Sequence, residues 1–130
     1  MQVRKAPRFE KLIASGRDLA NQSVSLTFQD SAANNFEIEL SLQSVPLSIF
    51  ALANEQGRIL STLPAQERPS VQAIQGTGIR PALGEDGALA LIFHLAGGGE
   101  LTMEFPKTAI SGLAQALTEL ASGADRNRYH

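Results

Sequence analysis

The sequence of 130 residues contains no cysteine and no tryptophan, and only two histidines and one tyrosine. Without cysteine there are no disulfide bonds, no thiolate metal sites and no cysteine nucleophiles. Two histidines are too few to complete a metal shell built on imidazole, so we expect no metal site. With so few aromatic rings there is no sugar-binding cleft, and the carboxylates Glu37 and Glu39 are interpreted as a solvated strand face rather than as a catalytic pair.

Long apolar runs and catalytic motifs are missing as well. No stretch approaches the 18 or more continuous apolar residues of a membrane span, and the amino terminus lacks the apolar core of a signal peptide. We therefore expect a cytoplasmic protein with no membrane partner. The glycine-rich segments 76–78 and 97–99 do not stand in the strand, loop and helix order of a nucleotide site. We expect no cofactor. The missing catalytic motifs disfavour an enzyme but do not exclude one.

The charges are few and unevenly distributed. The net charge is −2, but residues 1–17 carry five basic side chains against the single acid Glu10, whereas residues 18–125 hold twelve acids against four bases. An acidic body repels a phosphate backbone, so nucleic acid is not an expected partner unless the basic ends bind it. Residues 1–8 and 124–130 are expected to be flexible ends.

Two alternating segments predict a first hairpin. Residues 23–29 and 36–42 carry apolar side chains at every second position, which is the period of half-buried strands. The polar stretch 30–35 between them is rich in asparagine and aspartate and predicts a turn. The two apolar faces match when the strands pair as Val24 with Leu40, Leu26 with Ile38 and Phe28 with Phe36.

Three further segments complete the first half of the chain. Apolar residues at helical spacing predict a short helix over residues 7–15 that ends at Gly16. A second helix is predicted over residues 45–56, although its β-branched and aromatic residues also permit a strand. Residues 59–70, with two prolines around a polar stretch, read as the longest connection in the domain.

The second half repeats this order of strands and helix. A strand is predicted over residues 71–80, weakened by glycines that suggest a bulge. A hairpin follows over residues 88–105, with a loop of three to five residues centred on the glycines 97–99. Its predicted pairs are Leu95 with Leu101, Phe93 with Met103 and Leu91 with Phe105. Residues 107–121 predict an amphipathic helix that lies on the apolar face of this hairpin.

Together these segments predict an α+β fold that forms a single domain over residues 1–130. We expect one antiparallel sheet of about five strands in two hairpin groups, with two main helices packed on it. The hairpin and helix of the first half resemble in pattern those of the second half. This similarity suggests a degenerate ββα repeat.

Four residues of the second half are the candidate site. Ile92 and His94 lie on the hairpin face opposite the predicted core, which is less polar than the outer face of the first hairpin and is therefore expected to be covered. Arg80 is a candidate for pairing with an anionic ligand. Glu104 is a candidate carboxylate for acid–base chemistry, which requires it to converge with His94 in a cleft.

The leading functional hypothesis is a small cytoplasmic, non-enzymatic protein that acts by protein association, as a homodimer or an accessory subunit. It rests on the semi-apolar face around Ile92 and on the missing catalytic groups. The alternative is a small-molecule-binding domain with an apolar pocket between sheet and helices near Gly76, Gly78, Arg80 and His94. Fold class at this level does not choose between them.

Overall fold

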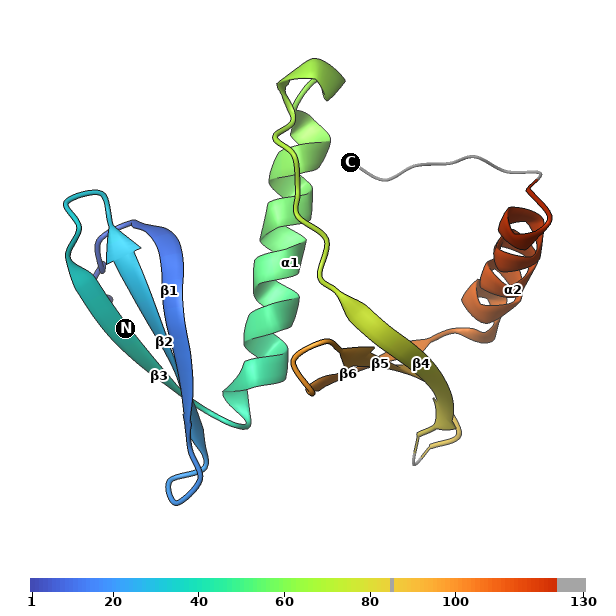
Figure 1. The fold of residues 1–130 in the computed structure, drawn as a ribbon, viewed down its shortest axis with the longest axis horizontal. Coiled ribbons are helices and arrows are strands. Elements are labelled where there is room, and N and C mark those ends of the chain that lie inside the picture. The colour runs from blue at the N-terminus through green and yellow to red at the C-terminus, as the bar shows by residue number, and fades with distance from the viewer. Residues whose placement is uncertain (85, 124–130) are drawn as a thin grey trace. The chain divides into compact units, whose positions relative to one another are not determined.

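A computed structural model describes residues 1–84 and 86–123, so the predicted flexible end 124–130 lies outside the described residues. The fold is α+β, with two antiparallel sheets of three strands each and two helices (Figure 1). The prediction of one sheet with about five strands was therefore wrong. The elements are β1 (Phe9–Asp18), β2 (Ser23–Asp30), β3 (Asn35–Ser41), α1 (Ser44–Thr62), a 3-10 turn (Ala65–Glu67), β4 (Gly76–Leu83), β5 (Leu89–Leu95), β6 (Glu100–Phe105) and α2 (Lys107–Ala121).

The chain divides into two compact units, residues 1–68 and residues 69–130. Each unit contains three strands that neighbour one another in sequence order, followed by one helix. The first unit holds β1, β2, β3 and α1, and the second holds β4, β5, β6 and α2. That the chain behaves as a single domain stays a prediction.

The first sheet confirms the predicted hairpin. Val24 pairs with Leu40, Leu26 with Ile38 and Phe28 with Phe36, as the alternation predicted. Strand β1 adds Phe9 to the same face, where its ring stacks on Phe28 at 5.1 Å and lies 5.6 Å from Phe36. Ring contacts at these distances contribute beyond the area they bury.

The predicted helix over residues 7–15 was wrong, because this segment lies in strand β1. Phe9 pairs with Asp30 and Leu12 with Phe28, so three steps along β1 match two steps along β2. The extra residue is a bulge, and it returns Leu12 to the face that Phe9 occupies. Apolar residues three apart therefore suggested a helix where the chain forms an irregular strand.

The helix predicted over residues 45–56 is present and longer than expected. Helix α1 continues through Gly57 to Thr62. A Cβ atom at Gly57 would meet no other atom within 4 Å, so this glycine lies in an open helix interior and does not end the helix. The connection predicted over residues 59–70 instead covers residues 63–75, because α1 continues to Thr62 and the next strand begins at Gly76, and it includes the 3-10 turn.

The second sheet confirms the predicted hairpin but not its register. Leu89 pairs with Phe105, Leu91 with Met103 and Phe93 with Leu101, a shift of two residues from the predicted pairs. A shift of two keeps every side chain on its face, so the apolar face is as expected. Four residues lie between β5 and β6, and the N–H of Leu95 donates to the Gly99 carbonyl at 2.8 Å, which leaves three residues between this closing pair. Among them Gly98 adopts a φ of +93°. Strand β4 begins at Gly76, later than the predicted residue 71, and α2 has the predicted bounds 107–121.

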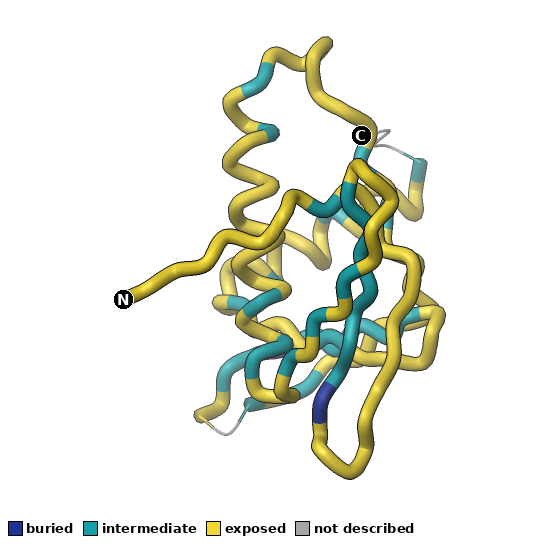
Figure 2. The backbone as a smooth tube through the Cα atoms, turned by 90° about the vertical axis from the view of Figure 1, so that its left-hand side faces the viewer, coloured by how far each residue is buried: buried dark blue, intermediate teal, exposed yellow. Residues whose placement is uncertain are grey.

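Burial is concentrated in the central strands of the two sheets (Figure 2). Within the described part of the chain only Ala90 and Ser23 are buried, at 5% and 6% exposure. Neither helix contains a buried residue among those described. Each unit therefore leaves apolar side chains in solvent.

Candidate functional site

The four candidate residues lie on one face of the second sheet. Arg80 pairs with Ile92, His94 lies two positions along β5 from Ile92, and Glu104 pairs with Ala90. Cross-strand partners have Cβ atoms about 5 Å apart, so these side chains are neighbours. We call this the His94 face: Gly78, Arg80, Ala82, Ala90, Ile92, His94, Glu100, Thr102 and Glu104.

The carboxylate beside His94 is that of Glu100. Nδ1 of His94 lies 3.4 Å from Oε1 of Glu100, which is an ion-pair distance when the imidazole is protonated. The predicted register placed Thr102 opposite His94, and so the sequence analysis missed Glu100. The length of the glycine loop is the signal that decides between them: a loop that closes between Leu95 and Gly99 brings Glu100 opposite His94, whereas the predicted closure between Leu95 and Leu101 would bring Thr102 there.

Glu104 lies at the end of the sheet opposite to His94. A Cβ atom at Gly84 would lie 3.3 Å from Oε1 of Glu104 and 3.3 Å from Oδ1 of Asp86, so the Glu104 carboxylate lies beside the β4–β5 turn. Asp86 itself accepts a hydrogen bond from the N–H of Ala88 at 3.0 Å. Glu100 and Glu104 are about 13 Å apart along β6 at about 3.3 Å per residue. The convergence of His94 and Glu104 that acid–base chemistry requires is therefore not formed.

A bulge in β4 brings the backbone close to His94. The pairing is irregular between Gly76 and Gly78, and a Cβ atom at Gly78 would lie 3.7 Å from Cδ2 of His94. The hydroxyl of Thr77 donates to the His94 carbonyl at 3.4 Å. With Nδ1 directed at Glu100, the chemistry left to His94 is proton exchange or one polar contact through Nε2. No group of three or more metal-ligating side chains occurs among the described residues.

The opposite face of this sheet is more apolar. We call it the Leu91 face, and by the strand register it consists of Ile79, Pro81, Leu83, Leu89, Leu91, Phe93, Leu101, Met103 and Phe105. Ile79, Leu83 and Met103 are 59%, 72% and 43% exposed. Exposed apolar area of this kind is typical of an interaction surface.

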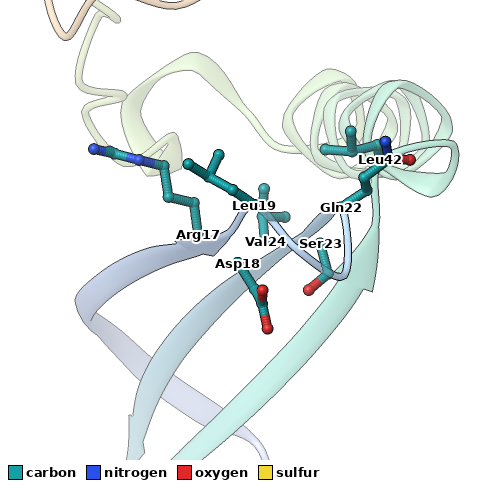
Figure 3. A pocket seen from close by; sticks show the side chains of 7 residues that line it. All are labelled: Arg17, Asp18, Leu19, Gln22, Ser23, Val24 and Leu42. Atoms are coloured by element: carbon teal, nitrogen blue, oxygen red, sulfur yellow. The ribbon is translucent and has the colours of Figure 1, made fainter.

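A separate hollow of about 410 Å³ lies in the first unit, at the β1–β2 turn (Figure 3). Its lining combines apolar and polar residues; the lining residues are Arg17, Asp18, Leu19, Gln22, Ser23, Val24 and Leu42. The Asp18 carboxylate points away from Leu19 and Leu42 (Figure 3). It accepts hydrogen bonds from the backbone and side chain of Asn21, and the backbone N–H, together with the side-chain amide, lowers the pKa of Asp18.

The sequence analysis treated Arg17 only as part of the basic amino-terminal segment. Nothing in the alternation of β1 or β2 signals a hollow, because the turn that brings Leu19 and Leu42 together depends on Gln22, whose φ is +50°. A positive φ is uncommon for a residue other than glycine. The hollow could be located only from coordinates.

Comparisons with known proteins add no assignment. No protein-family model, no curated protein and no solved structure matches this chain. No helix in the described residues is long and apolar enough to cross a membrane. The two faces of the second sheet and the hollow of the first unit are the surface features with the clearest binding chemistry.

Proposed function

We propose that this chain is a cytoplasmic, non-enzymatic protein that works by association with a second copy of itself. The single observation that carries the proposal is the exposed Leu91 face, where Ile79 and Leu83 are more than half exposed. Apolar area left in water on one face of a sheet is unfavourable, and a partner that covers it removes that cost. An accessory-subunit role is the same proposal with a different protein as the partner.

The His94 face is the second candidate surface for this association. Ile92 lies at its centre, half-buried, between Arg80 and Thr102. The charges at its margins make it more polar than the Leu91 face, and charged residues are depleted in the cores of interfaces. We therefore rank the Leu91 face first.

Light scattering during size exclusion tests the proposal. At tens of micromolar the protein should elute with a mass of 27.8 kDa, twice the 13.9 kDa of one chain. Met103→Glu places a charge on the Leu91 face and should shift the mass toward one chain, whereas Ile92→Glu, on the opposite face, should not. Dissociation by Ile92→Glu alone would assign the interface to the His94 face. A monomeric unmodified protein at this concentration would refute self-association.

The hollow at Arg17 favours small-molecule binding as a second candidate function. Its volume falls within the range of ligand sites, and Arg17 stands at its margin beside the apolar Leu19 and Val24, a combination that suits an amphipathic carboxylate. Decanoate should raise the thermal midpoint of the protein, and Arg17→Gln should abolish the shift while Arg58→Gln, in helix α1, leaves it. An equal shift in both variants would contradict this candidate. The pocket expected near Arg80 and His94 stays a prediction.

The common element order supports the proposed repeat. Each unit has three antiparallel strands in sequence order and then a helix, so the repeating unit is βββα, one strand longer than the predicted ββα pattern. We infer that the two units derive from one duplicated unit. An experimental structure with different strand orders in the two sheets would contradict this.

A further inference from the structure

Helix α2 has an apolar stripe that its own sheet does not cover. Its apolar residues recur at helical spacing, and three of them, Leu113, Leu117 and Leu120, are 40%, 53% and 45% exposed. Among the described residues α2 makes no extensive contact with a strand of its own unit. A 15-residue helix is marginal in water by itself, so α2 needs an apolar surface to lie on.

The Leu91 face has the dimensions of this helix. Three strands about 4.8 Å apart, with about 3.3 Å per residue, make a face of roughly 14 by 23 Å over the seven residues of β5. Helix α2 has 15 residues and is therefore about 22 Å long and about 10 Å wide. One such helix covers one such face.

The connection between β6 and α2 is too short for α2 to cover its own sheet. Pro106 alone links Phe105 to Lys107, and its ψ of 152° extends the chain. A helix on a sheet has its axis about 10 Å away, so its first Cα atom stands roughly 8 Å from the strands. Two Cα steps span at most about 7 Å, and the helix must also reverse direction. Connections of this type usually have two to six residues.

We propose that α2 of each copy packs on the Leu91 face of the other copy, so that two chains exchange their carboxyl-terminal helices. The helix exchange rests on the self-association proposed above, and it specifies which surfaces of the two copies are in contact. Two reciprocal helix–sheet contacts bury roughly 1,000 Å², the size at which a specific interface begins. The exchange is closed by a two-fold axis, because each chain gives one helix and receives one.

Introduced cysteines test the exchange, since the chain has none of its own. Ala114→Cys lies in the middle of the apolar side of α2, and Met103→Cys lies on the Leu91 face. The two single variants are unfolded together, refolded as a mixture and treated with a bismaleimide of about 10 Å reach, the separation expected of packed elements. The expected result is a covalent heterodimer. Thr102→Cys, on the opposite face of the same strand, is the matched control and should give little product.

A chain that carries both Ala114→Cys and Met103→Cys can test helix exchange and self-association separately. An interchain product from Ala114→Cys with Met103→Cys supports exchange. An intrachain product in a protein that is still dimeric would overturn exchange and leave self-association intact. An intrachain product in a monomer would overturn both.

A longer connection gives an independent readout. Inserting Gly-Ser-Gly-Ser-Gly after Pro106 should let α2 reach its own sheet and shift the mass from 27.8 kDa toward 13.9 kDa. The same insertion after Gly123, beyond the helix, should leave the dimer unchanged. A dimer that persists with the longer connection, with the helix crosslinked to its own sheet, would contradict the proposed exchange.

Discussion

The two units of this chain share an element order but differ in the link between their last strand and their helix. In the first unit Leu42 and Gln43 separate β3 from α1, and α1 contacts β3. In the second unit Pro106 alone separates β6 from α2, and no comparable contact forms in the described residues. Both helices nevertheless leave apolar side chains exposed, at 72% for Leu47 in α1 and 53% for Leu117 in α2. The shorter linker of the second unit is the difference on which the proposed helix exchange rests.

The units also differ in how their turns are held. In the first unit Asp18 and Asp30 accept backbone hydrogen bonds within the two turns of the sheet, from Asn21 at 3.1 Å and from Asn34 at 2.9 Å. In the second unit the β5–β6 turn depends on the positive φ of Gly98. We therefore expect the first sheet to respond to pH at its turns, and the second to respond to substitution of Gly98.

The largest expected effect is on the free energy of unfolding, and it is found by comparing the central strands β2 and β5. Leu26→Ala in β2 and Leu91→Ala in β5 should each lower the free energy of unfolding by about 2 kcal/mol, because each removes a half-buried leucine. The cost of Leu91→Ala should shrink when the protein is diluted below its dimer affinity, whereas that of Leu26→Ala should not. Urea denaturation at high and low protein concentration measures both. If the destabilisation by both variants depended equally on protein concentration, the proposal that only the second unit forms the dimer interface would be contradicted.

A smaller effect is expected at the β5–β6 turn. Gly98→Ala should cost about 1–2 kcal/mol, because φ is +93° and a side chain strains this conformation. Gly97→Ala is the matched control: a Cβ atom there meets nothing within 4 Å, and its φ is not positive. Thermal unfolding of the two variants compares them. Equal stability would show that this turn does not set the register that pairs His94 with Glu100.

The central strands show which parts of the fold the sequence could predict, and strand β1 shows a part that it could not. The strands around Leu26 and Leu91 were predicted because one face of each sheet is apolar and the other polar, which imposes a period of two. The helix over residues 107–121 was predicted for the corresponding reason at a period of 3.6. Strand β1 was missed because its bulges shift apolar residues to a spacing of three.

The candidate site was predicted as a face but not as a set of contacts. Consecutive glycines permit several loop lengths, and a change of two residues in register preserves the faces while exchanging Thr102 for Glu100 opposite His94. Periodicity carries no information on that choice. Whether a helix can reach its own sheet is likewise a matter of reach in three dimensions.

The smallest effect concerns pH. Backbone N–H groups of Asn21 and Asn34 stabilise the ionised carboxylates and hold the pKa values of Asp18 and Asp30 below 3.8. A lowered folded-state pKa contributes stability above the unfolded-state pKa, and this is lost as the pH falls through the folded-state value. Below about pH 4 the first sheet should therefore weaken at its turns. Amide exchange at Asn21 and Asn34 measures this, and Asp18→Asn with Asp30→Asn should flatten the pH dependence; an unchanged profile would contradict it.

The bulges of β1 have a consequence for how copies of this chain assemble. β1 is an edge strand, and a straight edge would accept a further strand from another molecule and grow without limit. Its two irregularities interrupt the row of backbone donors and acceptors, and Lys11 adds a charge there. In the other sheet Pro81 removes one donor from edge strand β4. Addition of a further strand at these two edges is thereby disfavoured, which leaves the faces of the sheets rather than the edges β1 and β4 for contact between copies.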